Sequence, residues 1–430
     1  MNAEIISIGN ELLIGQVVNT NASWMAEQLN LAGIRVKQIT SIADEQEDIL
    51  MALEEAESRA SVVLVTGGLG PTKDDITKEA ICKYFKTRLV FNQEAFDSIE
   101  QLFALRGYKV TELNRKQADI PETSIPLPNH NGTAPGIWLE KIRDDKTVNT
   151  VFVFMPGVPF EMKPMFTETV IPRLKAEFPT KSIFHKTILT QGIGESFLSD
   201  IIEKWEVSLP KNISLAYLPQ PGIVRLRLSG IGEKDDEIRQ RVLKEAGKLE
   251  KLIPDYIFGY DEDKLEEIVG KLLKEKQQTL ATAESCTGGY IAHLITSIPG
   301  SSLYYKGSVV AYSNEIKETE LNVRHDSLVQ YGAVSEQVVL EMATGIRKKF
   351  RTDFAIATSG IAGPEGGTKD KPAGTTWIAI ATPEKVFAKH YLFGERENRE
   401  RNIRKTALQA LNLLRKEISE SSEAAMRHSQ

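Results

Sequence analysis

Residues 282–289, Thr-Ala-Glu-Ser-Cys-Thr-Gly-Gly, place a serine at a strand-to-helix turn. The apolar run 279–283 predicts a strand before the turn, and the helical spacing of apolar residues in 290–295 predicts a helix after it. Such a turn exposes the hydroxyl of Ser285 and directs free backbone N–H groups at an anion or a developing oxyanion. The backbone groups predicted to bind the substrate are those of Thr287, Gly288 and Gly289.

A lysine is the base that this serine requires. A serine hydroxyl is a poor nucleophile unless a base removes its proton during attack. The six histidines are scattered along the chain, so Lys317, in the segment 312–317 Tyr-Ser-Asn-Glu-Ile-Lys, is the available base. Complete burial lowers the pKa of a lysine by up to about 3–5 units, which allows a lysine in a closed cleft to accept a proton. Serine and lysine together are the parts of a Ser–Lys amide hydrolase.

Two further segments are expected to complete this site. The glycine-rich segment 359–364, Ser-Gly-Ile-Ala-Gly-Pro, follows the apolar strand 354–358 and is predicted to face the serine turn. The segment 393–396, Phe-Gly-Glu-Arg, supplies a guanidinium suited to a phosphate or a carboxylate. The substrate contacts predicted here are Ser359, Gly360, Gly363 and Arg396.

Each of these residues taken alone has another explanation. Ser285 is suited to capping the following helix, and Cys286 is either the nucleophile or a small buried side chain. Lys317 fits a solvated helix face, and Arg396 belongs to a charge-rich run, 395–405, of a kind that usually faces solvent. All of them together are far less expected by chance than any one alone, which favours the catalytic interpretation.

A second glycine-rich loop occupies residues 66–77, Thr-Gly-Gly-Leu-Gly-Pro-Thr-Lys-Asp-Asp-Ile-Thr. It follows the uninterrupted apolar run 62–66, which is typical of a strand buried on both faces of a parallel sheet. Such a loop brings backbone N–H groups to a phosphate, and the adjacent Asp74 and Asp75 are suited to a hard divalent cation. The alternative is a helix start whose acids complement the helix dipole. The predicted ligand contacts are Thr66, Gly67, Gly68, Gly70, Thr77 and, from a later Gly/Pro loop, Glu161.

The C-terminal motifs resemble those of the CinA family of nicotinamide mononucleotide amidohydrolases. The resemblance covers residues 265–414 and rests on T-A-E-S-C-T-G-G, Y-S-N-E-x-K, G-A-V-S-E and S-G-I-A-G-P-x-G-G. It implies that Ser285 and Lys317 are the catalytic pair and that this domain uses no cofactor. It also implies a site role for further residues: Tyr312 among the catalytic ones, Asn314, Arg396, and a second arginine that is either Arg399 or Arg401.

The N-terminal motifs resemble the molybdopterin-binding fold and, more closely, the N-terminal domain of CinA-type proteins. That resemblance implies ADP-ribose pyrophosphatase activity that depends on Mg²⁺, Mn²⁺ or Co²⁺. The part between the two domains resembles the family's KH-like insert. A nucleic-acid-binding KH domain needs a G-x-x-G loop, and the segment 192–195, Gly-Ile-Gly-Glu, lacks the last glycine. We therefore expect a linker and interface module rather than an RNA-binding one.

The expected fold class is α/β, with two three-layer α/β domains joined by a small α+β module. Strands alternating with helices predict the first α/β domain over residues 1–175. A strand, a short helix, a hairpin about Pro219–Gly222 and a long helix predict the module over 178–254. The α/β pattern returns over 260–418.

Composition limits the classes of function. Lys and Arg number 53 against 59 Asp and Glu, which gives a net charge of −6 and no basic excess for direct nucleic-acid binding. No apolar run approaches the length of a membrane helix, no basic segment precedes the first strand, and there are only two cysteines. We expect a cytoplasmic homo-oligomer in pyridine-nucleotide salvage, with nicotinamide mononucleotide and ADP-ribose as its small-molecule partners. The alternatives are a molybdopterin-binding protein and a non-enzymatic competence or recombination partner.

Overall fold

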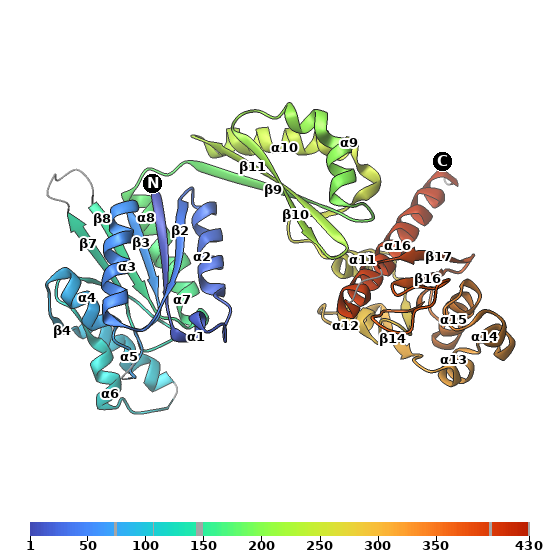
Figure 1. The fold of residues 1–430 in the computed structure, drawn as a ribbon, viewed down its shortest axis with the longest axis horizontal. Helices are drawn as coiled ribbons and strands as arrows, with labels where there is room; N and C mark the ends of the chain where they lie inside the picture. Colours follow the sequence, from blue (N-terminus) through green and yellow to red (C-terminus); the bar gives the residue numbers. More distant parts are fainter. Residues whose placement is uncertain (73–74, 106, 143–148, 395–397, 429–430) are drawn as a thin grey trace. The chain divides into compact units, whose positions relative to one another are not determined.

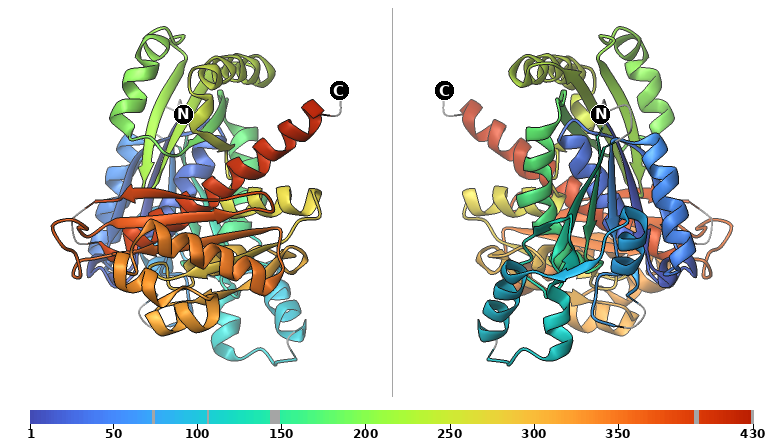
Figure 2. Two further views of the ribbon diagram at one scale, coloured as in Figure 1. Left: turned by 90° about the vertical axis from the view of Figure 1, so that its right-hand side faces the viewer. Right: turned by 90° about the vertical axis from the view of Figure 1, so that its left-hand side faces the viewer.

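The computed structural model describes residues 1–72, 75–105, 107–142, 149–394 and 398–428. Contacts between Cα atoms divide the chain into two compact units. One unit contains residues 1–184 and 230–239, and the other contains residues 185–229 and 240–430. Figures 1 and 2 show a sheet flanked by helices at each end of the sequence.

The first unit contains a six-stranded sheet in the order β2-β1-β3-β8-β7-β6 (Figure 1). The strands β2, β1, β3 and β8 run parallel, and β7 and β6 extend the sheet in the antiparallel sense. The bounds are β1 Asn2–Ile8, β2 Arg35–Ile42, β3 Val62–Thr66, β6 Ile125–Leu127, β7 Gly136–Ile142 and β8 Asn149–Met155. A separate antiparallel pair is formed by β4 Leu89–Phe91 and β5 Asp119–Pro121.

Helices cover both faces of this sheet because successive residues of its buried strands point to opposite sides. Ile5 and Leu64 pack with α2, α7 and α8, whereas Ile6 and Val65 pack with α3 and α4. The helix bounds are α1 Asn10–Leu13, α2 Thr20–Leu31, α3 Gln46–Arg59, α4 Thr77–Phe85, α5 Gln93–Leu105, α6 Glu112–Arg115, α7 Pro159–Met165 and α8 Ile171–Glu177.

The middle of the chain forms a four-stranded sheet in the order β10-β11-β9-β12 with two helices. Its strands are β9 Ser182–Thr190, β10 Ile213–Gln220, β11 Ile223–Gly232 and β12 Ile257–Tyr260, and its helices are α9 Glu195–Val207 and α10 Asp235–Leu252. The hairpin expected about residues 219–222 is present between β10 and β11. This is the expected small α+β module.

The C-terminal sheet has the order β14-β13-β15-β16-β17. β13 pairs in parallel with β14 and β15, and β16 and β17 are antiparallel. The strands are β13 Leu280–Glu284, β14 Tyr305–Val310, β15 Phe354–Gly360, β16 Thr375–Ala381 and β17 Val386–Leu392. The helices are α11 Leu265–Glu275, α12 Tyr290–Thr296, α13 Asn314–Leu321, α14 His325–Tyr331, α15 Glu336–Phe350 and α16 Arg399–His428.

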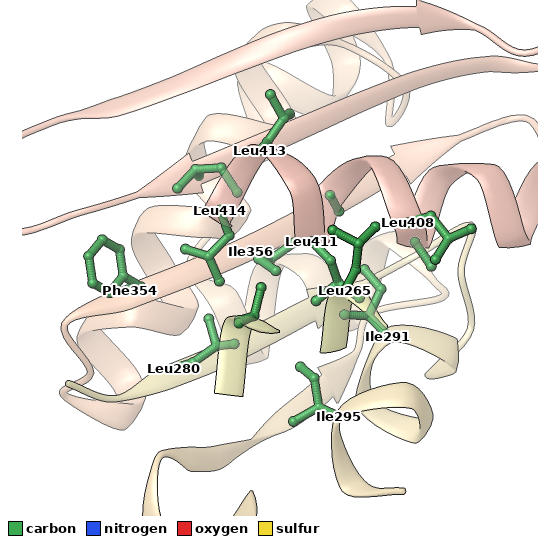
Figure 3. Close-up of a cluster of buried hydrophobic side chains, with 14 of the residues drawn as sticks. Leu265, Leu280, Ile291, Ile295, Phe354, Ile356, Leu408, Leu411, Leu413 and Leu414 are labelled. Atoms are coloured by element: carbon green, nitrogen blue, oxygen red, sulfur yellow. The ribbon is translucent and has the colours of Figure 1, made fainter. Parts of the chain in front are cut away.

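The two faces of this sheet carry different side chains. Leu280 and Ile356 face a core built with α11, α12 and α16, where Leu411 and Leu414 of α16 lie beside them (Figure 3). The alanines that alternate with them, including Ala281, face α13 and α15. Layers of helix, sheet and helix confirm the predicted fold class.

Candidate active site

The serine turn lies at the carboxyl end of β13. Glu284, the last residue of β13, is in register with Val310 of β14 and with Thr358 of β15. The next residue, Ser285, donates its N–H to the carbonyl oxygen of Thr358 over 3.0 Å and is half-buried. Three strands thus bring their residues to one level at Ser285, at the sheet edge where open α/β folds bind ligands.

The two glycines of the turn are required by its backbone. Gly288 and Gly289 have φ angles of +59° and +95°, which side chains rarely tolerate. The N–H of Gly288 donates to Ser285 O over 3.2 Å, and the N–H of Gly289 donates to Glu284 Oε2 over 3.1 Å. The Gly289 N–H predicted to meet the substrate is therefore already bound. Within the described part of the chain, the N–H of Thr287 meets no acceptor and is open to a ligand.

Glu284 is a site residue that sequence reasoning missed. Its side chain is fully buried, and besides Gly289 it accepts the N–H groups of Ile291 over 3.0 Å and Ala292 over 2.8 Å. It therefore satisfies the donors that the start of α12 would otherwise leave unpaired. The available signal was an acidic residue at the end of an apolar strand, directly before the serine.

Lys317 of α13 is almost completely buried, with 1% of its surface exposed. Its Nζ donates to the carbonyl oxygen of Ala311 over 2.7 Å, and Ala311 directly follows Val310, the β14 residue level with Glu284. Burial lowers the pKa of Lys317 below its usual 10.5, and Cys286 opposes this shift weakly. Among the described residues no carboxylate forms an ion pair with Lys317, and no hydrogen bond joins its Nζ to Ser285.

Cys286 is suited to a core position and not to nucleophilic attack. Its side chain is 7% exposed, and burial raises the pKa of its thiol to about 12. The thiolate is the nucleophilic form of cysteine, and it is scarce at neutral pH with such a pKa. Of the two interpretations open for Cys286, the structure supports the buried side chain.

A hollow of about 660 Å³ opens beside the turn. Its walls include Arg399 of α16, and it is also lined by the predicted residues Thr287, Gly288 and Gly289. The resemblance left either Arg399 or Arg401 as the second site arginine. Arg399 lines this hollow together with the predicted residues of the turn, whereas Arg401 lines a different hollow. The structure therefore places Arg399 here.

Arg399 also connects two predicted site segments. Its Nη2 donates to the hydroxyl of Tyr312 over 2.9 Å, and its Nη1 donates to the carbonyl oxygen of Gly363 over 3.1 Å. Tyr312 is otherwise exposed. Arg399 thus connects the segment 312–317 to the glycine-rich segment 359–364.

Other predicted contacts have structural roles or lie apart from the hollow. Ser359 is buried and donates its hydroxyl to Ala333 O over 2.7 Å. Gly360 packs so closely on β16 that a Cβ would lie 2.8 Å from Thr375 O. Asn314 is exposed at the start of α13, and Arg396 lies outside the described residues.

The N-terminal glycine-rich loop is held by side-chain hydroxyls. Thr66 donates to Pro156 O over 2.9 Å, and Thr77 donates to Gly67 O over 3.4 Å. Gly67 has a φ of +114°, and Gly68 has a φ of +65° with Thr77 Oγ1 only 2.0 Å from where a Cβ would be. These two glycines are therefore demanded by the turn itself.

Asp75 makes a second set of contacts in the same loop. Its Oδ2 accepts the N–H and the hydroxyl of Thr72, and a Cβ on Gly70 would lie 2.6 Å from that oxygen. Oδ1 accepts no hydrogen bond from a described residue, so one carboxylate oxygen is left for a cation. Asp74 lies outside the described residues, and no cluster of three ligating side chains is found among those described.

The carboxyl ends of β1 and β3 border a small hollow of about 120 Å³. Two buried side-chain oxygens in its lining, Ser7 Oγ and Asn21 Oδ1, have no hydrogen-bond partner among the described residues. Thr66 also lines it. Glu161 does not line it: its Oε2 accepts from Asn129 Nδ2 over 2.8 Å, which fastens α7 to the loop that precedes β7.

Comparisons with known proteins match nearly the whole length of the chain to one family. Family models match the probable molybdopterin binding domain at residues 4–176, the damage-inducible protein CinA KH domain at 185–259 and the CinA C-terminal domain at 262–418. A CinA-like protein of Cytophaga hutchinsonii is 47% identical over 420 residues, covering 97% of this chain and 98% of that protein. A putative competence-damage inducible protein of Caldanaerobacter subterraneus is 41% identical over 97% of this chain and 98% of its own length.

Among solved structures, the competence/damage inducible protein CihA of Agrobacterium tumefaciens is 36% identical, with a TM-score of 0.33. The match covers 35% of this chain and 93% of that chain. In the described residues no helix is long and apolar enough to cross a membrane. The family models and the full-length relatives together establish that this chain belongs to the CinA family.

Proposed function

We propose that the C-terminal domain hydrolyses the carboxamide of nicotinamide mononucleotide to nicotinate mononucleotide and ammonia. The observation that carries this proposal is the buried Lys317, whose pKa is lowered and whose Nζ is bound to the carbonyl oxygen of Ala311, the residue after the β14 partner of Glu284. A hydrolase that uses serine without histidine needs an amine that can give up its proton, and burial shifts the pKa of Lys317 in that direction. The CinA membership and the match to its C-terminal domain support the same reaction.

The chemistry follows from these groups. Ser285 Oγ attacks the carboxamide carbon while its proton passes to the Lys317 Nζ lone pair, since a neutral amine can donate to Ala311 O and still accept a proton. The open N–H of Thr287 is suited to the oxyanion. Lys317 then protonates the departing ammonia, and the acyl-enzyme forms on Ser285. In the second half, Lys317 takes a proton from water as the water oxygen attacks the acyl carbon. The bond between that carbon and Ser285 Oγ then breaks, Lys317 returns the proton to Oγ, and the acid product is released.

The adjoining hollow fits the substrate. A volume of about 660 Å³ is in the range of pockets for molecules of nucleotide size. Arg399 provides a fixed guanidinium there, and guanidinium groups bind phosphate through two parallel hydrogen bonds. The proposal therefore assigns the substrate phosphate to Arg399 and requires the nicotinamide ring to extend from the hollow toward Ser285, which follows Glu284 and precedes the lining residues Thr287–Gly289.

We propose a second activity, metal-dependent hydrolysis of the ADP-ribose pyrophosphate, for the N-terminal domain. The specific observation is that Ser7 Oγ and Asn21 Oδ1 are buried without partners in a hollow at the strand ends. Buried polar atoms are normally paired, so a ligand with donor groups is expected there. A divalent cation, when bound, would polarise a phosphate. Mg²⁺ is typically bound by one or two carboxylates together with phosphate oxygens and water. Asp75 can supply one such carboxylate oxygen, because its Oδ1 accepts no hydrogen bond from a described residue.

Product analysis of the pure full-length protein tests both activities. Nicotinamide mononucleotide should yield nicotinate mononucleotide and ammonia without added metal. ADP-ribose should yield AMP and ribose 5-phosphate only with Mg²⁺, Mn²⁺ or Co²⁺. Tight pterin binding without hydrolysis of either substrate would favour a molybdopterin-binding protein, and absence of all three would favour a non-enzymatic competence or recombination partner.

A further inference from the structure

A third hollow, of about 710 Å³, lies within the unit of residues 185–229 and 240–430 and shares no lining residue with the hollow at Thr287–Gly289. Its walls come from α16 and β17, from the loop 191–195 that precedes α9, and from the β10–β11 hairpin. The volume suits a small organic ligand. No step of the chemistry derived above uses it.

Cations gather around this hollow. Lys389 of β17 and Arg401, Lys405 and Lys416 of α16 line it, against the single carboxylate of Glu195. Among the described residues none of the four cations forms an ion pair. Burial, and then the charge of Arg401, lowers the pKa of Lys405. Burial and then Arg415 lower the pKa of Lys416, and Asp255 and Glu420 offset part of this shift. Like charges that are only partly compensated repel one another, and a bound anion relieves that repulsion.

Two aromatic rings lie beside these cations. Tyr391 and Phe393 are stacked, with ring centroids 5.4 Å apart and an interplanar angle of 3°. Lys405 Nζ lies 6.0 Å from the centre of the Phe393 ring and donates to Phe393 O over 3.2 Å. Both rings are half-buried and line the hollow, so they offer an aromatic surface next to positive charge. Nucleotide bases stack on such surfaces.

The loop 191–195, which also lines the hollow, contains an unpaired acceptor. Gln191 is 3% exposed, and its Oε1 is buried with no hydrogen-bond partner in the part of the chain that the structure describes. Its backbone N–H donates to Tyr256 O over 2.9 Å, which fixes the start of the loop. An unpaired buried amide oxygen is costly, and a hydroxyl or amino group of a ligand would satisfy it.

We propose that this hollow binds a nucleotide, with its phosphate on the cations, its base beside Tyr391 and Phe393, and a ligand hydroxyl or amino group donating to Gln191 Oε1. The phosphate, the base and a donor group of the nucleotide then each have a complementary group in the lining of the hollow: the cations, the two aromatic rings and the Gln191 amide oxygen. A volume of about 710 Å³ suits a single nucleotide and not a long strand. The site is independent of the activities proposed above.

Hydrogen exchange of the full-length protein tests this proposal, because it reports binding locally even if AMP also occupies another domain. AMP should slow amide exchange in residues 191–195 and 389–393, whereas adenosine, which lacks the phosphate, should not. The variant Lys389→Gln/Arg401→Gln removes two exposed cations. It should weaken the protection by AMP on the order of tenfold, the factor that about 1.4 kcal/mol represents. The control Lys271→Gln/Lys348→Gln removes two exposed lysines outside the hollow and should behave as the wild type.

A second arm separates the ring from the phosphate. Phe393→Leu should weaken protection by AMP and leave any effect of inorganic phosphate unchanged. Four results would overturn the proposal: no protection by AMP at these segments, equal protection by inorganic phosphate and AMP, equal weakening in the control variant, or protection by an eight-residue oligothymidylate where AMP has none.

Discussion

Replacing Lys317 by methionine should abolish amide hydrolysis without destabilising the fold. Methionine keeps the length of the side chain and removes its charge and its basic nitrogen. Because the wild-type side chain is 1% exposed, an ammonium there has lost nearly all its hydration, which costs several kcal/mol in real proteins. Against this, the variant loses the hydrogen bond to Ala311 O and leaves that oxygen unpaired, a loss of about 1–3 kcal/mol. The net expectation is a gain of about 1–2 kcal/mol at pH 7.

The pH dependence has a defined sign. The folded protein holds Lys317 with a pKa below 10.5, so between that value and 10.5 the unfolded chain binds more protons. Wild-type stability therefore rises with pH through this window, and the advantage of the methionine variant shrinks. The wild-type kcat/KM should rise as Lys317 loses its proton, with a midpoint below 10.5.

Ammonia release measures the activity, and hydrogen exchange of the β13 and β15 amides measures the stability of this domain. Activity should fall on the order of 10⁴-fold. Lys348→Met, on the exposed side of α15, is the control and should leave both quantities unchanged. Residual activity near the wild-type level, or destabilisation by several kcal/mol at pH 7, would refute the assignment of Lys317 as a desolvated base.

Three further outcomes are expected. Ser285→Ala should reduce ammonia release on the order of 10⁴-fold or more while Cys286→Ala keeps most of it, and the reverse result would transfer the nucleophile to the cysteine. Arg399→Lys should raise KM for nicotinamide mononucleotide about tenfold with a smaller change in kcat, because lysine cannot contact Tyr312 OH and Gly363 O together. An unchanged KM would show that Arg399 does not bind the substrate phosphate. Asp75→Asn should lower metal-dependent ADP-ribose cleavage on the order of tenfold and spare amide hydrolysis, and loss of both activities on chelation would indicate a shared site.

Local pattern was enough to predict most elements of the fold. The apolar runs that end at Thr66 and just before Ser285 are strands because both faces of those strands are covered, and their short length and the glycine-rich turns after them made this predictable. The antiparallel strands β7 and β16 could not be assigned from pattern, since the direction of a buried strand depends on partners distant in sequence. The domain boundaries expected at 175, 254 and 260 stay predictions.

The site was predictable only as far as residue type specifies a role. Lys317 could be proposed as a base because its chemistry is distinctive, but its burial depends on how α13 packs on the alanine face of the sheet. Ser359 has the right type and neighbourhood, yet its hydroxyl is committed to Ala333 O, a contact that no spacing rule foresees. The same holds for Arg399, whose partners lie 36 and 87 residues away along the chain.

Glu284 explains why the serine turn has the geometry that catalysis needs. A helix start following directly on a strand end would direct several N–H groups at whatever anion lies nearby, and the side chain of the preceding residue is the nearest. By accepting from Gly289, Ile291 and Ala292, the Glu284 carboxylate fixes α12 to the end of β13 and removes those donors from competition for substrate. Among the described residues, the N–H groups of Cys286 and Thr287 and the hydroxyl of Ser285 then have no backbone or carboxylate partner, and these are the groups to which the proposal assigns the oxyanion and the attack. If the proposed amide hydrolysis is correct, the buried glutamate keeps the start of α12 from binding a second anion, and the phosphate of the substrate is expected at Arg399 instead.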